Sequence, residues 1–131
     1  MSEPRYKHVL LIDDNEIDNI ISRKVIEKEH FASQISSVKS APEGLQMLKD
    51  SSGKPSLPDL IFLDIMMPLV DGFGFLDEFA KLPEEITKNI KIIMLSTSES
   101  FKDLNKANKN RFVCKFLNKP LTEQVLAAIN V

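Results

Sequence analysis

Short apolar segments alternate with amphipathic segments along the whole chain, and this alternation limits the folds that are open to it. Residues 9–12 and 60–63 carry only aliphatic and aromatic side chains, which is typical of strands buried on both faces of a sheet. Less uniform strands are predicted at residues 34–38, 90–95 and 112–117. A helix-like segment follows each strand. Five strands alternating with five helices predict an α/β fold, an open five-stranded parallel sheet with helices on both faces.

Capping residues and helical periodicity set the expected helix bounds. Asn15 resembles an N-cap, with acids following in the first turn. Ser40 and Glu43 have the spacing of a capping box, with a proline between them. Pro83 breaks the third helix and leaves an added turn before the fourth strand. The helices are predicted over residues 15–30, 41–49, 73–80, 101–108 and 122–130.

The length and charge of the chain exclude several classes of protein. At 131 residues it fits one domain, and a formal net charge of −2 gives no electrostatic reason for nucleic-acid binding. No apolar stretch approaches the roughly 20 residues that span a bilayer. The first eight residues lack the apolar core of a signal peptide. We therefore expect a single cytoplasmic domain over residues 1–131, without direct nucleic-acid contact or membrane insertion.

The cysteine and the histidines suggest no chemistry of their own. Cys114 is the single cysteine, so an internal disulfide is excluded and a reducing compartment is compatible. Because it lies inside an apolar run, we expect it to be a small buried hydrophobe. His8 and His30 lack a partner at metal-binding spacing and are expected to be solvated.

Acidic residues follow two of the predicted strands. Asp13 and Asp14 come directly after residues 9–12, and Asp64 comes directly after residues 60–63. The carboxyl ends of parallel strands meet at one edge of the sheet, where ligands of such folds bind. If the two strands are neighbours, the three carboxylates converge. They would repel one another unless a cation binds among them or one of them is modified.

Two further polar residues are expected at the same edge. Ser96 ends the fourth strand and Lys119 follows the fifth. Carboxylate oxygens of this kind suit Mg²⁺, which completes its shell with water and phosphate. The arrangement suits phosphoryl chemistry, in which Asp64 attacks a phosphoryl group and Lys119 supplies a fixed positive charge. Ser96 would donate a hydroxyl hydrogen bond to the group once it is attached.

Four motifs in order resemble those of the receiver domain of two-component response regulators, over essentially the whole chain. They are LIDDN at residues 11–15, FLDIMMPLVDGF at 62–73, MLS at 94–96 and FLNKP at 116–120. An acid pair or a Lys-Pro pair alone is weak evidence, but four motifs at predicted strand ends are specific. The resemblance implies a stand-alone receiver with the flavodoxin-like strand order 2-1-3-4-5 and no output domain.

The resemblance also assigns roles to individual residues. It implies Asp64 as the phosphoacceptor and Asp13 and Asp14 as the acidic pocket, with Asp14 a direct Mg²⁺ ligand. Asp64 and the backbone carbonyl of Met66 would complete the protein ligands. Lys119 would contact the phosphoryl group, and its bond to Pro120 would be cis.

A switch and a set of partners follow from the same resemblance. Ser96 matches the hydroxyl residue drawn onto the phosphoryl group, and Phe116 matches the aromatic residue that turns inward behind it. The surface altered by this switch would comprise residues 101–108, 112–117 and 122–130. The donor would be a sensor histidine kinase or a histidine phosphotransfer protein, and the downstream protein is unknown. Such a receiver catalyses its own phosphoryl transfer and slow autodephosphorylation but is not otherwise an enzyme.

Three residues depart from the family pattern. Ser96 replaces the commoner threonine, which keeps the hydrogen bond but leaves its rotamer less constrained. Thr97 stands where a small residue is usual, and we expect it to narrow access to the site. Asn118 stands where an apolar residue is common, and no physical reason for it is evident.

Other readings of the site remain open at this point. A hydrolase of the haloacid-dehalogenase type needs a second acid two residues after its nucleophile, where Met66 stands. A flavodoxin-like nucleotide binder needs a phosphate-cradling loop, and Asp13 and Asp14 would repel a phosphate there. A receiver-like interaction module that acts without phosphorylation is the main alternative. The protein would be either a phosphoryl shuttle or an effector that docks on a target.

Overall fold

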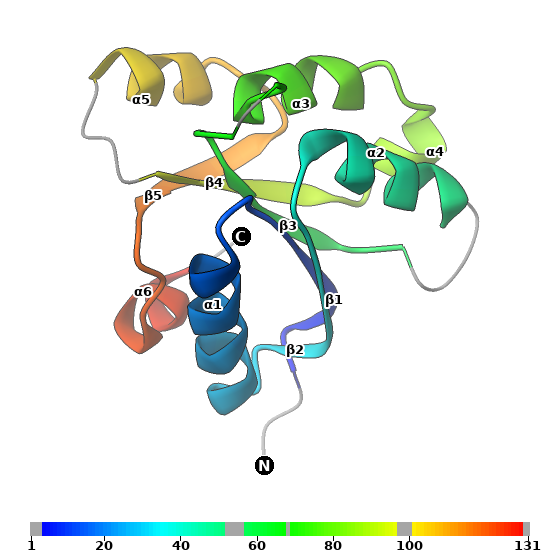
Figure 1. Cartoon of the computed structure of the whole chain (residues 1–131). Helices are drawn as coiled ribbons and strands as arrows, with labels where there is room; N and C mark the ends of the chain where they lie inside the picture. The colour runs from blue at the N-terminus through cyan, green and yellow to red at the C-terminus, as the bar shows by residue number, and fades with distance from the viewer. Residues whose placement is uncertain (1–3, 52–56, 68, 97–100, 130–131) are drawn as a thin grey trace.

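Five parallel strands form one sheet in the order β2-β1-β3-β4-β5 (Figure 1). The computed structural model describes residues 4–51, 57–67, 69–96 and 101–129. This topology confirms the expected fold class and the flavodoxin-like strand order. The strands are β1 (Tyr6–Ile12), β2 (Ala32–Val38), β3 (Leu60–Asp64), β4 (Lys91–Ser96) and β5 (Val113–Asn118).

The described residues form six helices, one more than predicted. The added turn after Pro83 is a four-residue helix, because proline holds the backbone in a conformation that suits a helix start. Side chains of Asn15, Ser40 and Thr122 accept hydrogen bonds from backbone N–H groups in the first turn of their helices. The helices are α1 (Glu16–Lys28), α2 (Ala41–Asp50), α3 (Gly72–Phe79), α4 (Glu84–Thr87), α5 (Phe101–Asn108) and α6 (Glu123–Ala128).

Helices cover both faces of the sheet, so its central strands are buried on each side. Figure 1 shows α1 and α6 on one face and the other helices on the opposite face. Alternate strand residues point to opposite faces, so Leu11 and Phe62 join the α1 and α6 side. Ile12 and Leu63 join the other side, where Phe75 is also buried. No helix in the described ranges has the length and apolar character needed to cross a membrane.

The expectation that His8 is solvated is wrong. Strand β1 begins at Tyr6, three residues before the predicted start, and this places His8 inside the sheet with 2% of its surface exposed. Its Nε2 lies 2.8 Å from the hydroxyl oxygen of Ser36 on β2. A polar partner on the neighbouring strand therefore allows the imidazole to be buried. His30 is exposed, as expected.

The expectation that Cys114 is buried is also wrong, since its side chain is exposed. In the pairing of β4 with β5, Ile92 lies opposite Val113 and Ile93 lies opposite Lys115. Cys114 is thus the extra residue of a β-bulge on an edge strand, where the ladder is interrupted. The apolar run indicated a strand but not this local irregularity.

Close packing at the carboxyl end of β3 fixes the position of the following helix. The N–H of Gly72 donates a 2.9 Å hydrogen bond to the carbonyl oxygen of Ile65. A Cβ atom at Gly72 would lie 2.6 Å from the carbonyl oxygen of Asp64, which is closer than the atoms can approach. Glycine is therefore required where α3 meets the end of the central strand.

Candidate functional site

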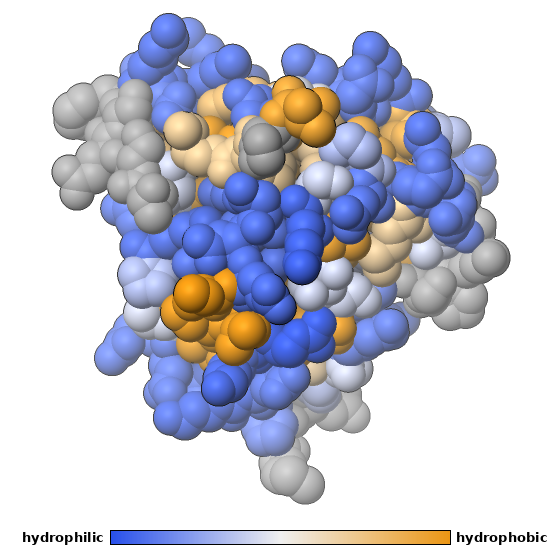
Figure 2. Space-filling model, in the orientation of Figure 1, coloured by the Kyte–Doolittle hydropathy of each residue, from blue (hydrophilic) through white to orange (hydrophobic). Residues whose placement is uncertain are grey.

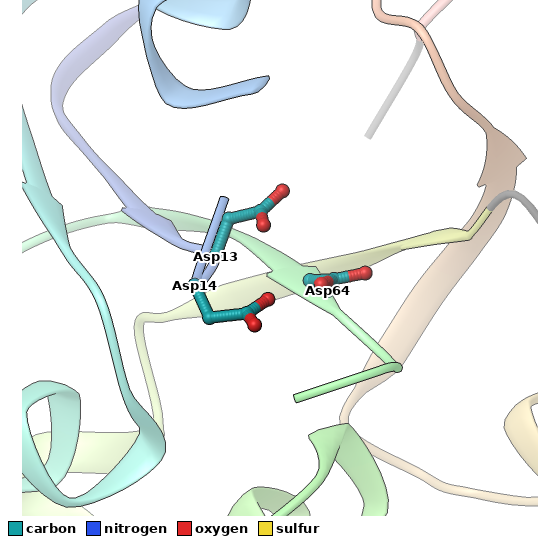
Figure 3. A group of neighbouring side chains, drawn as sticks. All are labelled: Asp13, Asp14 and Asp64. Carbon is teal, nitrogen blue, oxygen red and sulfur yellow. The ribbon is translucent and has the colours of Figure 1, made fainter. Parts of the chain in front are cut away.

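The acids predicted from the sequence lie together at the carboxyl edge of the sheet. Ile12 pairs with Leu63, so Asp13 and Asp64 follow at matching levels on adjacent strands. Each of Asp13, Asp14 and Asp64 offers one carboxylate oxygen, and these oxygens lie within 4.8 Å of one another. Figure 3 shows the three side chains directed into the same space. Asp13 and Asp64 are buried, whereas Asp14 is exposed.

The ammonium group of Lys119 is enclosed by carboxylates. Its Nζ lies 2.5 Å from Asp13 Oδ2, 2.9 Å from Asp18 Oδ2 and 3.2 Å from Asp64 Oδ1. Only 9% of the lysine side chain is exposed. The peptide bond between Lys119 and Pro120 is cis, as the family resemblance implied. The predicted convergence of this lysine with Asp64 is therefore present in the structure.

Burial and charge set the protonation of the two central groups. Burial, followed by the negative charge of Asp13, raises the pKa of Asp64 to about 6, although Lys119 opposes this shift. A backbone hydrogen bond from Met66 also favours the ionised carboxylate. Burial works to lower the pKa of Lys119, but its hydrogen bonds to Asp13 and Asp18 raise that pKa above its usual value. The lysine is thus a permanent cation beside a carboxyl group whose pKa is about 6.

The first turn of α1 holds the acid pocket in place. The N–H of Asn15 donates a 2.9 Å hydrogen bond to Asp13 Oδ1. The side-chain amide of Asn19 donates one of the same length to the backbone carbonyl of Asp13. Asp13 is therefore fixed through both its carboxylate and its backbone.

Sequence reasoning missed Asp18 as a site residue and treated it only as an acid of a helix start. Its contact with Lys119 joins residues 101 positions apart, so local spacing carries no sign of it. One available signal was the topology. A helix that follows the acid pair must begin at the same sheet edge, which brings its first-turn side chains close to the site.

The other predicted site residues lie on β4, on β5 and just after β3. Ser96 is fully buried at the end of β4 and pairs with Asn118 on β5. Phe116 pairs with Met94 and packs, partly buried, against the core beneath α3 and α5. The side chain of Met66 is 65% exposed. Thr97, expected to narrow the entrance, lies outside the described residues.

The donor set fits a hard divalent cation. Asp13, Asp14 and Asp64 provide carboxylate oxygens from two strand ends, and one of the three acids is open to solvent. Mg²⁺ prefers oxygen ligands and retains several waters, so a partly open group of carboxylates suits it. A cation here would also relieve the repulsion between the acids.

The surface around the site is hydrophilic, and an apolar patch lies next to it. Hydrophilic residues gather at its mouth, and Figure 2 shows an apolar patch beside them over α1. The α1 residues Ile17, Ile20 and Ile21 have 67%, 47% and 40% of their surface exposed. Large aliphatic side chains grouped on one helix beside a polar site are typical of an interaction surface.

A doubly wound α/β sheet with an acidic site at its carboxyl edge defines the class of this protein, and comparisons identify the family. The family model described as response regulator receiver domain matches residues 9–130. The chain therefore belongs to the response regulator receiver family of two-component signalling proteins.

Individual relatives agree with this assignment. The chain is 30% identical to the probable methanogenesis regulatory protein FilR2 of Methanothrix harundinacea, over 87% of this chain and 72% of that protein. It is 29% identical to the chemotaxis protein CheY of Halobacterium salinarum, over 87% of this chain and 88% of that protein. A crystal structure of a two-component response regulator from Cytophaga hutchinsonii superposes with a TM-score of 0.87. The two chains are 29% identical, and the match covers 94% of this chain and 92% of the other.

Proposed function

We propose that this protein accepts a phosphoryl group on Asp64 from a phosphohistidine protein, with Mg²⁺, and thereby changes its protein-binding surface. The observation that carries the proposal is the position of Lys119, whose ammonium lies 3.2 Å from Asp64 within a group of carboxylates. An acceptor carboxylate beside a fixed cation and a candidate metal site is what phosphoryl transfer requires.

The chemistry can be written for the residues of this chain. A carboxylate oxygen of Asp64 attacks phosphorus, the P–N bond to the donor histidine breaks, and the electron pair leaves with the imidazole. Lys119 offers N–H donors and positive charge to the transferred oxygens. Asp13, Asp14, Asp64 and the Met66 carbonyl would hold Mg²⁺, which supplies further charge neutralisation when bound. Slow attack of water on the acyl phosphate would return Asp64 to its free form.

Ser96 and Phe116 are the proposed switch residues. The Ser96 hydroxyl would donate a hydrogen bond to the phosphoryl group, and Phe116 would move inward behind it. Phe116 lies on β5, so this movement would alter the surface formed by α5, β5 and α6. A downstream protein would distinguish the two forms there.

The exposed isoleucines of α1 support the choice of a protein donor. They lie on the helix whose first turn holds the acid pocket, so they offer an apolar docking surface next to Asp64. A sensor histidine kinase or a histidine phosphotransfer protein would provide the phosphohistidine. We place this phosphoryl transfer in the cytoplasm, where ATP maintains phosphohistidine donors. The organisation as a stand-alone single domain stays a prediction.

Action without phosphorylation is less well supported. The three acids and Lys119 are all present in this chain. Bringing three carboxylates together costs electrostatic free energy, and a module that only binds other proteins would gain nothing from that cost. A hydrolase of the haloacid-dehalogenase type is disfavoured because the exposed Met66 stands where its second acid would be.

A small phosphodonor tests the proposal directly. Incubation with acetyl phosphate and Mg²⁺ should add one phosphoryl group, stable in acid and labile in base, as measured by intact-protein mass spectrometry. Asp64→Asn should abolish the addition. Asp77→Asn, which removes an exposed acid of α3, should not. Labelling that persists in Asp64→Asn would reject Asp64 as the acceptor.

A further inference from the structure

We infer that Asp18 is a positioning residue for Lys119, which holds the ammonium group toward α1 and limits its competition with a cation for Asp13 and Asp64. The inference rests on the proposed function, in which those two acids bind Mg²⁺. It concerns a residue outside the acid pocket that touches the site through the lysine.

The hydrogen-bond pattern of the helix start leaves the Asp18 carboxylate available for this task. Asp18 occupies the third helical position, where an acid commonly reaches back to the N–H of the N-cap residue. Here that N–H, of Asn15, is already donated to Asp13 Oδ1. The Asp18 side chain is instead directed to Lys119, with Oδ2 2.9 Å from Nζ.

Lys119 has three N–H donors, and three carboxylates surround it. Two of them, from Asp13 and Asp64, also belong to the candidate metal site. An oxygen that binds a cation is less available to the lysine, so the metal and the ammonium compete for these two groups. Asp18 is not part of the clustered acids. The contact of Asp18 with Lys119 can therefore persist when Asp13 and Asp64 bind the cation.

Burial increases the importance of this third contact. The lysine side chain is 9% exposed, so an ammonium that lost its partner on α1 would remain inside the pocket. It would then pair more closely with Asp13 and Asp64. Loss of Asp18 also removes one negative charge from the region, and both effects weaken cation binding.

The first experiment measures Mg²⁺ binding by calorimetry, without any phosphodonor. Asp18→Asn should raise the Mg²⁺ dissociation constant by about 3- to 10-fold, which is at or below the lower end of the roughly 10- to 100-fold typical of residues that hold metal ligands directly, because Asp18 acts through Lys119. Glu16→Gln is the matched control, because it removes one exposed negative charge from the same helical turn. It should change the constant less than twofold, by roughly what a screened surface charge contributes. Asp18→Glu should restore most of the affinity, since it keeps the carboxylate.

The second experiment observes the lysine in metal-free protein by nitrogen-15 NMR. Its ammonium signal, assigned by its absence in Lys119→Arg, should exchange slowly with water in the parent protein and several-fold faster in Asp18→Asn. Glu16→Gln should leave this exchange unchanged. A general loss of folding would instead affect other signals throughout the spectrum.

The outcomes separate this inference from the proposed function. If the parent protein binds Mg²⁺ but Asp18→Asn binds it equally well, or changes no more than Glu16→Gln, the role of Asp18 is rejected and the proposed function stands. If the parent protein does not bind Mg²⁺, the proposed function fails and this inference fails with it. Unchanged exchange of the Lys119 ammonium in Asp18→Asn would also overturn the positioning role.

Discussion

The backbone N–H of Lys119 donates a 2.9 Å hydrogen bond to the carbonyl oxygen of Ser96. This bond links the end of β4 to the residue that follows β5, and it continues the pairing of Ser96 with Asn118. The hydroxyl and the cation expected to contact the phosphoryl group are thus fixed to each other through the backbone. Rearrangement around Ser96 would therefore be transmitted to β5, the strand that carries Phe116.

Asp64→Asn should raise the melting temperature of the metal-free protein. The pKa of Asp64 in the folded protein, about 6, lies above its ordinary value of 3.8, so the folded state binds this proton more tightly than the unfolded chain. Protonation of Asp64 therefore stabilises the folded state. This stabilisation is complete below about pH 4 and is lost as pH rises through about 6. At neutral pH the ionised group costs about 1–3 kcal/mol, allowing for screening at the open mouth of the pocket.

The change in melting temperature caused by Asp64→Asn should depend on pH. The gain in melting temperature of Asp64→Asn should be small near pH 4.5 and larger near pH 7.5, and saturating Mg²⁺ should reduce it by stabilising the parent protein. Differential scanning calorimetry with Asp77→Asn as control measures the comparison. A variant that melts lower than the parent at neutral pH without metal would show that the acids are separately stabilised.

Asp14→Asn should weaken Mg²⁺ binding more than Asp13→Asn does. Asp13 already accepts hydrogen bonds from Lys119 and from the N–H of Asn15, whereas the Asp14 carboxylate is exposed beside it. We expect the dissociation constant of Asp14→Asn to rise by about tenfold or more, which corresponds to about 1.4 kcal/mol. Calorimetric titration of both variants tests the order, and a larger loss in Asp13→Asn would reverse the assignment of the direct ligand.

Gly72→Ala should destabilise the protein and displace the acceptor residue. The new Cβ would meet the Asp64 carbonyl oxygen at 2.6 Å and the Ile65 Cα at 3.0 Å, both of which are backbone atoms. We expect a loss of about 1–3 kcal/mol in the free energy of unfolding, typical of overpacking. Urea denaturation measures it, and phosphorylation by acetyl phosphate should slow in parallel.

Gly74→Ala is the matched control for this substitution. Its Cβ would lie 2.8 Å from Cγ1 of Val70, so that side chain must shift, but no backbone atom is in the way, and alanine favours the helix by about 1 kcal/mol over glycine. Gly74→Ala should therefore cost less stability than Gly72→Ala. Equal losses in the two variants would argue against a specific constraint at the end of β3.

Met66→Asn should shorten the lifetime of the phosphorylated protein. We expect the exposed side chain of Met66 to border the approach of water to Asp64, and a thioether cannot orient a water molecule as an amide can. We expect decay to become several-fold faster in purified phosphoprotein with excess Mg²⁺. Thr97→Ala should add to the effect if Thr97 crowds the entrance. Equal or slower decay in Met66→Asn would remove the proposed role of this side chain.

The sequence predicted the sheet because each strand carries its own signal. Apolar runs that end in Asp13 or Asp64 indicate both a buried strand and the edge where it stops, and parallel topology then brings the acids together. The fit of four motifs to one family added the strand order and the cis bond at Lys119. These features depend on local sequence, and few topologies are compatible with this alternation of strands and helices.

The errors and omissions arose where a distant partner decides the outcome. Burial of His8 depends on Ser36 of the neighbouring strand, and exposure of Cys114 depends on a bulge in the β4–β5 pairing. Asp18 looks like any acid in a first helical turn, and its role appears only when Lys119 is placed beside it. Periodicity reports which face a residue occupies in regular structure, but not which side chain meets it there.

Chemical identification of the phosphorylated residue is the most direct test of Asp64 as the acceptor. Borohydride reduces an aspartyl phosphate to homoserine, so treatment of phosphorylated protein followed by peptide mass spectrometry marks the acceptor. We expect homoserine in place of Asp64, formed only when both Mg²⁺ and a phosphodonor were present. Homoserine at Asp13, Asp14 or another acid, or no conversion of a protein that binds Mg²⁺, would contradict it.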